Sequence, residues 1–253
     1  MSRAAVVTMV RDEKVFLPIW LRYYGRFVGP QDLYVLDHGS TDGSTDGGGF
    51  VRVPADHPTK DEGWKRDVLQ AQQHELLERY DIVLVTDVDE IVAPDPRGGD
   101  LGDYLDGFDA DFVTCRGYEV IHMRDEEPPL DPAQPITEQR GWWFFNPAYC
   151  KPLLARVPMQ WTGGMHGCTD GSTFDDGCLH LLHLHRMDYD ICLGRHHQRL
   201  SVPWAARDWN EGWGYQNRIV EPESFARWFY EDTSCGGFPL TPEPIPTQWR
   251  GVV

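Results

Sequence analysis

The sequence predicts an α/β fold: a central, mostly parallel mixed sheet flanked by helices. Over the first ninety residues, short apolar runs rich in β-branched residues alternate with longer segments of helical spacing. This order is typical of parallel strands joined by crossover helices. The chain has 253 residues, of which 41% are hydrophobic and 25% charged, enough for a well-buried core. Because no internal repeat or clean linker is visible, we expect a single domain over residues 1–253.

The first half gives the clearer pattern. The expected elements are, in order, a strand over 4–10, a helix over 15–28, a strand over 33–36, a loop over 37–44, a helix over 64–80 and a strand over 82–86. Pro18 fits the first helix only in its first turn, where a missing N–H costs nothing. The loop is assigned from its density of Asp, Gly, Ser and Thr.

The second half is less regular. The expected elements are a strand over 112–123, a flexible segment over 124–140, strands over 149–155 and 178–185, and a helix over 188–200. From residue 204 onward the chain is rich in Trp, Pro and Gly, and it receives no assignment.

Acidic residues follow three of the predicted strands. Asp12, Asp37 and Asp87 each lie just past a strand end. Ligands of parallel α/β sheets collect at the carboxyl ends of the strands. We therefore expect these three carboxylates at one edge of the sheet.

The segment Asp87-Val88-Asp89-Glu90 is the strongest candidate for a metal site. In an extended chain, residues two apart point the same way, so Asp87 and Asp89 can aim at one point. Carboxylates suit Mg²⁺ or Mn²⁺, and such a cation can clamp a departing diphosphate. The alternative is a turn cap with solvated acids, but the alignment with other strand-end acids favours a site.

Three ordered motifs resemble those of family 2 glycosyltransferases. They are VTMVRDE at 7–13, VLDHGSTDGS at 35–44 and DVDEI at 87–91. The DVDE form and a later His-rich strand also resemble the related family 92. The resemblance covers roughly the first 95 residues. It implies a GT-A fold, a nucleoside-diphosphate sugar donor (a UDP- or GDP-sugar), a saccharide or small-molecule acceptor, a divalent metal (Mn²⁺ or Mg²⁺) and the inversion usual in that family.

The resemblance also implies roles for individual residues. Asp37 and the backbone near Val10 and Arg11 would hold the base and ribose, Asp89 would bind the metal, and Asp87 would support the sugar or ribose. Residues 1–95 would form the nucleotide-sugar-binding half and 96–253 the acceptor-binding half. Many family members have a second Asp where this chain has His38, which leaves the nucleotide open.

Three further cations can offset diphosphate charge. Lys65 and Arg66 open the helix before the DVDE strand, and Lys151 lies in an apolar strand where it needs a partner. An ordinary solvated helix face is the competing interpretation for the first two. The predicted nucleotide-sugar contacts are thus Val10, Arg11, Glu13, Asp37, Lys65, Arg66, Asp87, Val88 and Lys151.

The segment CLHLLHLHR at 178–186 supplies candidate histidine ligands. In a strand His183 and His185 share one face and His180 lies on the other. GT-A enzymes often use a late histidine as a further metal ligand, and a neutral imidazole suits that role. The predicted metal ligands are Asp87, Asp89, His183 and His185, with hydrogen-bonded, non-ligating histidines as the alternative.

An inverting transfer needs a general base for the acceptor hydroxyl. A glycine-rich segment at 163–170 can approach a ligand closely. It offers His166 and Asp170, and Asp176 and Glu211 are further candidates. Trp209 and Trp213 are among several tryptophans that can form apolar platforms or core, and the sequence does not choose among these residues.

Charge and cysteine content limit the partners and the compartment. The net charge of −17 makes nucleic acid and anionic membranes poor partners. No apolar stretch is long enough to span a bilayer, and no signal-peptide pattern opens the chain. The six cysteines show no CxxC pair, which indicates reduced thiols. We expect a cytoplasmic protein.

Two other functions share the predicted fold. A nucleotidyltransferase should show a Gly-rich, basic phosphate loop after the first strand, where this chain has Arg11-Asp12-Glu13-Lys14. A non-catalytic nucleotide- or glycan-binding descendant stays open because no base is evident. Fold alone does not separate these functions.

Overall fold

A computed structural model describes residues 2–169, 175–232, 234–235 and 238–253. Its larger sheet contains, in spatial order, β3 (Val51–Pro54), β2 (Leu33–Asp37), β1 (Ala4–Val10), β4 (Ile82–Val85), β9 (Leu154–Ala155) and β6 (Phe112–Val113). The first four strands are parallel, whereas β9 runs antiparallel to both of its neighbours. The carboxyl ends of β1, β2 and β4 therefore meet at one edge.

A second sheet contains, in spatial order, β13 (Glu243–Pro244), β8 (Trp142–Phe145), β7 (Arg116–Ile121), β10 (Leu179–His183) and β5 (Glu90–Pro94). Only β7 and β10 pair in parallel, and β10 pairs antiparallel with β5. Strands β11 (Ser234–Cys235) and β12 (Phe238–Pro239) form a small hairpin. Both main sheets are mixed.

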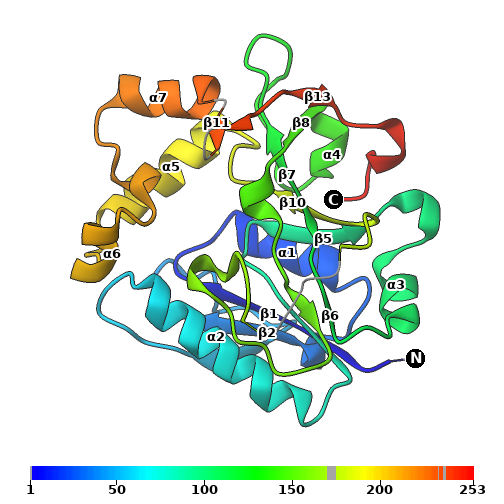
Figure 1. The fold of residues 1–253 in the computed structure, drawn as a ribbon. Coiled ribbons are helices and arrows are strands. Elements are labelled where there is room, and N and C mark those ends of the chain that lie inside the picture. Colours follow the sequence, from blue (N-terminus) through cyan, green and yellow to red (C-terminus); the bar gives the residue numbers. More distant parts are fainter. Residues whose placement is uncertain (1, 170–174, 233, 236–237) are drawn as a thin grey trace.

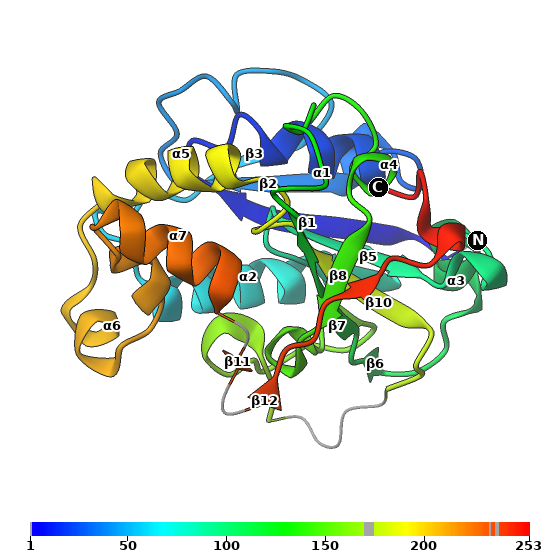
Figure 2. The same cartoon turned by 90° about the horizontal axis from the view of Figure 1, so that it is seen from above.

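The helices cover the sheets and one end of the molecule. They are α1 (Phe16–Tyr24), α2 (Glu62–Leu77), α3 (Leu101–Gly107), α4 (Ile136–Gln139), α5 (Tyr189–Leu200), α6 (Ala206–Glu211) and α7 (Pro222–Glu231). Helices α1 and α2 lie on opposite sides of the larger sheet, and α5, α6 and α7 gather at the end toward which β1 points (Figures 1 and 2). In the part of the chain that the structure describes, no helix is both long and apolar enough to cross a bilayer.

One continuous hydrophobic core joins the two sheets. All residues of β1, β4 and β5 are buried. The core cluster also takes in Trp20, Leu181 and Trp249. Strands covered on both faces become continuous apolar runs, which is why β1 and β4 are readable from sequence. The predicted α/β fold, with a central mixed sheet flanked by helices, is confirmed, while its assignment to the GT-A type and the single-domain boundary stay predictions.

Several predicted elements are corrected. The strand expected over 112–123 is broken into β6 and β7, because the chain changes sheets at residues 114–115. The strand expected over 149–155 shrinks to β9, and Tyr149 ends a 3-10 turn. Helix α1 ends at Tyr24 rather than 28. Strands β3, β5 and β8 were not predicted.

Candidate functional site

The DVDE segment connects the two sheets at the carboxyl edge. After β4 the chain makes a tight turn, in which Glu90 N donates to Asp87 O at 3.0 Å, and enters β5. Strand β10 runs antiparallel to β5 with His183 opposite Glu90. Leu184 N donates to Asp89 O at 2.8 Å. This strand register places His183 and His185 beside Asp89.

Asp89, His183 and His185 form a group that can hold a metal ion. One candidate ligand atom from each lies within 4.8 Å of the others. Asp89 Oδ2 is 3.3 Å from His185 Nδ1 and 3.7 Å from His183 Nε2, and the imidazole rings stack at 5.6 Å. Imidazole ligands suit transition metals such as Zn²⁺ and Fe²⁺, and carboxylates suit Mn²⁺ and Mg²⁺, so this mixed set fits a divalent transition metal. The predicted shared face of the two histidines is confirmed.

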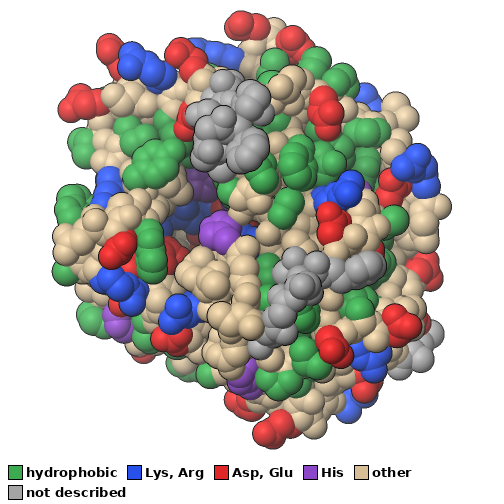
Figure 3. Space-filling view, in the orientation of Figure 1, with side chains coloured by type: hydrophobic (Ala, Val, Ile, Leu, Met, Phe, Trp, Pro, Cys, Tyr) green, Lys and Arg blue, Asp and Glu red, His purple; other side chains and the backbone are tan. Residues whose placement is uncertain are grey.

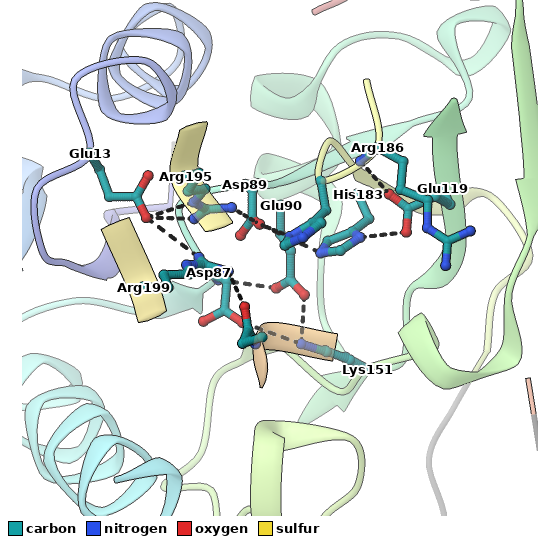
Figure 4. A network of polar contacts seen from close by, with 12 residues as sticks. Glu13, Asp87, Asp89, Glu90, Glu119, Lys151, His183, Arg186, Arg195 and Arg199 are labelled. Carbon is teal, nitrogen blue, oxygen red and sulfur yellow. Dashed lines mark hydrogen bonds and ion pairs between the residues drawn. The ribbon is translucent and has the colours of Figure 1, made fainter. Parts of the chain in front are cut away.

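Glu119 fixes the orientation of His183. In the sheet Glu119 of β7 is the register partner of His183. His183 Nδ1–H donates to Glu119 Oε2 at 2.9 Å, which leaves Nε2 with a lone pair on the side of Asp89 (Figure 4). Burial lowers the pKa of His183, but the carboxylates of Glu119, Asp89 and Glu90 together outweigh it, and the net pKa is raised. A carboxylate behind a histidine is the usual outer support of a metal ligand.

Replacing Glu119 with glutamine should weaken Mn²⁺ binding about ten- to hundredfold, the usual cost of losing an outer-shell carboxylate. The amide keeps an acceptor for His183 but loses the charge that raises ligand basicity. Free Mn²⁺ measured by electron paramagnetic resonance checks this directly. Glu126→Gln, at an exposed carboxylate that accepts from Trp142 Nε1, should leave Mn²⁺ affinity unchanged; equal weakening in both variants would contradict the role.

Arg195 of α5 neutralises the same carboxylate. Its guanidinium donates to Asp89 Oδ2, and it also donates to Glu13 Oε1 at 2.6–2.8 Å (Figure 4). The guanidinium lies 4.1 Å over the Phe16 ring. Burial opposes ionisation of Asp89, but Arg195 and the two histidines hold its pKa well below the ordinary value. Arg195 therefore supplies positive charge at the oxygen that a metal would use.

Asp87 is not part of the Asp89–His183–His185 group. Lys65 Nζ donates to its Oδ1 at 2.5 Å, and Lys151 Nζ lies 3.6 Å from its Oδ2. Lys151 also donates to Glu90 Oε1 at 2.5 Å. Burial opposes ionisation of Asp87, yet the two ammonium groups lower its pKa. Contrary to the expected convergence on one cation, the turn at 87–90 sends Asp87 and Asp89 to different partners.

These groups open onto a cavity of about 580 Å³. The molecular surface shows a hollow with Lys or Arg and histidine side chains visible inside it (Figure 3). Its lining contains six cations (Arg11, Lys60, Lys65, Lys151, Arg195 and Arg199) and seven carboxylates (Asp12, Glu13, Asp61, Glu62, Asp87, Asp89 and Glu90). The whole chain has 23 cations against 40 acidic residues. The cavity is thus much less acidic than the chain, and a divalent cation would make it positive.

Lys60 is a cavity cation without an acidic partner. Among the described residues no carboxylate oxygen lies within 4 Å of its ammonium group, which sits 4.4 Å over the Trp204 ring. Burial, followed by the nearby charge of Arg199, lowers the pKa of Lys60 to about 7. An anionic ligand in the cavity would supply the missing counter-charge.

Lys60→Met should therefore stabilise the free protein at pH 6 by about 2 kcal/mol, after allowing for solvent screening. Below pH 7 Lys60 is protonated in the folded chain, and burying its positive charge is unfavourable. Between pH 7 and 10.5 the folded chain releases this proton before the unfolded chain does, so the penalty disappears as pH rises. Urea unfolding at pH 6 and pH 10.5 measures the difference. The exposed Lys14→Met should show no such pH dependence, and an equal gain at both pH values would refute the explanation.

Most predicted nucleotide-sugar residues line this cavity. They are Val10, Arg11, Glu13, Lys65, Asp87, Val88 and Lys151. Arg66 and Asp37 are not among the lining residues. Arg66 pairs with Asp67, and the Asp37 carboxylate accepts bonds from Ser40 N, Thr45 Oγ1 and Arg52. Asp37 thus stabilises the loop after β2, while His38 lines the cavity instead.

The candidate bases also differ in whether they line the cavity. His166 lines the cavity, and its Nδ1–H donates to Ala148 O at 2.5 Å, which leaves Nε2 as an acceptor. Burial and the charge of Lys151 lower the pKa of His166 to about 4. Asp176 accepts from Tyr104 and from two backbone N–H groups, and exposed Glu211 ends α6; neither lines the cavity. Asp170 lies outside the described residues.

Sequence reasoning missed Glu119, Arg195 and Lys60. Glu119 carries a readable signal, since it is a single acidic residue beside the apolar residues Val120 and Ile121. Arg195 and Lys60 carry none, because an arginine in a polar helix and a lysine in a loop are ordinary surface residues in any sequence.

No family model matches the chain, and neither does any curated protein. Among solved structures, the chain is similar to the apo structure of WbbM, a bifunctional glycosyltransferase, at 16% identity and a TM-score of 0.28. The match covers 47% of this chain and spans only 23% of that chain. A likeness this weak carries no argument about activity, which has to rest on the site.

Proposed function

We propose that this protein is a metal-dependent glycosyltransferase that moves a sugar from a UDP- or GDP-sugar to an acceptor hydroxyl with inversion. One observation carries the proposal: Asp89, His183 and His185 meet just past the carboxyl end of the parallel strand β4, beside a cavity large enough for a nucleotide sugar. The six cavity cations, among them Lys60, which has no acidic partner within 4 Å in the described part of the chain, supply charge for a diphosphate. The ordered motifs of the first 95 residues agree with this assignment.

The side chains at the cavity have different roles in this proposal. Asp89, His183 and His185 would hold the metal, which when bound supplies positive charge to the leaving diphosphate. Lys65 and Lys151 flank Asp87 and are placed to bind phosphate oxygens or to orient Asp87 toward the sugar. His166 is the candidate base, because its Nε2 is free to accept the acceptor proton.

A thermal-shift panel tests the proposal. The protein is heated with UDP, GDP, ADP and CDP, each with and without Mn²⁺, and then with the corresponding nucleotide sugars. We expect one nucleoside diphosphate to raise the melting temperature only when Mn²⁺ is present, and its sugar form to be hydrolysed slowly. A panel without any Mn²⁺-dependent rise would contradict the assignment. Pyrophosphate release from a nucleoside triphosphate and a sugar phosphate would favour a nucleotidyltransferase instead.

A further inference from the structure

Three exposed aromatic side chains come from one short segment, residues 209–215, and one of them, Trp213, lines the cavity. Six large hydrophobic side chains are exposed among the described residues, and five of them lie between positions 200 and 220: Leu200, Trp209, Trp213, Tyr215 and Val220. Trp209 and Tyr215 are each 58% exposed. Single exposed apolar residues are normal, but several within one short segment that borders a cavity are typical of a binding surface.

The backbone around Trp213 is built to present this ring. Gly212 and Gly214 flank it with φ angles of 72° and 61°, a region that favours glycine. A side chain at Gly214 would also approach the Trp204 ring to 2.6 Å. The guanidinium of Arg207 lies 5.3 Å over the Trp213 ring. The two glycines thus set the backbone turn that carries Trp213, and Arg207 contacts its ring.

Arg218 fixes the neighbouring ring. Its guanidinium lies 4.5 Å over Trp209 and donates to the carbonyl oxygens of Asp208, Trp209 and Trp213 at 2.6–2.9 Å. Asp208 is fully buried and accepts from Glu62 N at 2.6 Å, which anchors α6 to the start of α2. Arg218 and Asp208 thus connect Trp209 and the backbone of Trp213 to the start of α2, where Glu62 lines the cavity.

The surface continues directly into the candidate catalytic cavity. Trp213 lines the cavity, and its ring lies 3.3 Å from where a Cβ of Gly163 would stand. Gly163 begins the short turn Gly163–Met165, which His166 follows. A ligand stacked on Trp213 would therefore lie beside the loop that carries the candidate base.

We propose that Trp209, Trp213 and Tyr215 form an acceptor platform, and that the acceptor is an oligosaccharide whose sugar rings stack on these side chains. The inference rests on the proposed transferase function, since it names the acceptor of that reaction. Flat aromatic faces match the C–H faces of sugar rings, and the cavity-lining amides of Gln216 and Asn217 can bind hydroxyl groups. The net charge of −17 opposes an anionic membrane, and three rings are too small for a stable protein interface.

Saturation-transfer NMR with defined oligosaccharides tests the platform. The probes are hexasaccharides of glucose (β-1,4 and α-1,4), N-acetylglucosamine (β-1,4), mannose (α-1,6) and xylose (β-1,4), together with a printed glycan array for wider coverage. The wild-type protein should bind at least one glycan, and Trp209→Ala should weaken that binding about tenfold. Phe145→Ala is the matched control, because Phe145 is an exposed aromatic residue (45%) outside the cavity lining and should bind as wild type does.

The outcomes separate this inference from the proposed function. No glycan binding by the wild-type protein, or equal binding by Trp209→Ala, overturns the platform. Self-association or binding to phosphatidylcholine vesicles that Trp209→Ala abolishes, without glycan binding, overturns it as well. The Mn²⁺-dependent response of the wild-type protein to nucleoside diphosphates is a separate measurement. If that response is present while glycan binding does not depend on Trp209, only the platform fails; if it is absent, the transferase assignment fails.

Discussion

Replacing Asp89 with asparagine should abolish the Mn²⁺-dependent stabilisation by a nucleoside diphosphate and lower Mn²⁺ affinity more than about a hundredfold. Losing an outer-shell partner costs up to about a hundredfold in metal affinity. Asp89 would contact the metal itself, so its loss should cost more. Asparagine has the same shape as aspartate, but it lacks the negative charge that Asp89 would offer to a metal held with the two histidines. Calorimetric titration with Mn²⁺, followed by thermal shifts with nucleotide, measures both effects.

Asp95→Asn is the matched control for this change. Asp95 directly follows β5, the strand that Asp89 precedes, and it pairs with Arg97 away from the cavity. It should bind Mn²⁺ and nucleotide as the wild-type protein does. Full Mn²⁺ affinity in Asp89→Asn would remove the metal site, and with it the main support for a transferase.

The first half of the fold is readable from sequence for a physical reason. Strands β1 and β4 are buried on both faces, so they appear as apolar runs, and the acids that follow them stand out. The edge on which Asp12 and Asp87 lie follows from parallel pairing alone. Strand β5 was missed because Glu90 looks like part of an acidic loop, although it is fully buried against Lys151.

The composition of the site depends on contacts that a sequence does not encode locally. The DVDE segment and the His-rich strand were each recognised, but their antiparallel register, with His183 opposite Glu90, comes from tertiary pairing. The turn that separates Asp87 from Asp89 likewise replaced the extended geometry expected from a strand end. Asp37 lies at the strand end where the motif predicts it. Its carboxylate, however, accepts hydrogen bonds from Ser40 and Thr45 of the following loop.

Replacing Arg195 with methionine should destabilise the protein by about 3–5 kcal/mol, because Asp89 and Glu13 stay buried and lose their shortest ion pair, with only Arg199 left 3.5 Å from Glu13. At a few degrees per kcal/mol for a chain of this size, the melting temperature should fall by about 10 °C. Methionine keeps an apolar contact with Phe16, so the loss reports charge more than packing. Thermal unfolding of the wild-type and Arg195→Met proteins without metal measures this fall in melting temperature.

Mn²⁺ should then restore much of this loss, and this response distinguishes a metal site from an ordinary buried ion pair. In the wild-type protein Arg195 and the metal compete for Asp89 Oδ2, so removing the guanidinium should increase the rise that Mn²⁺ produces. Arg140→Met is the matched control, because Arg140 is fully buried against Asp188 at 3.0 Å and lies outside the cavity lining. It should lose comparable stability but gain nothing from Mn²⁺. Equal restoration of both variants would show that Mn²⁺ acts non-specifically on an acidic protein, whereas restoration of Arg195→Met alone would locate the cation at Asp89, His183 and His185.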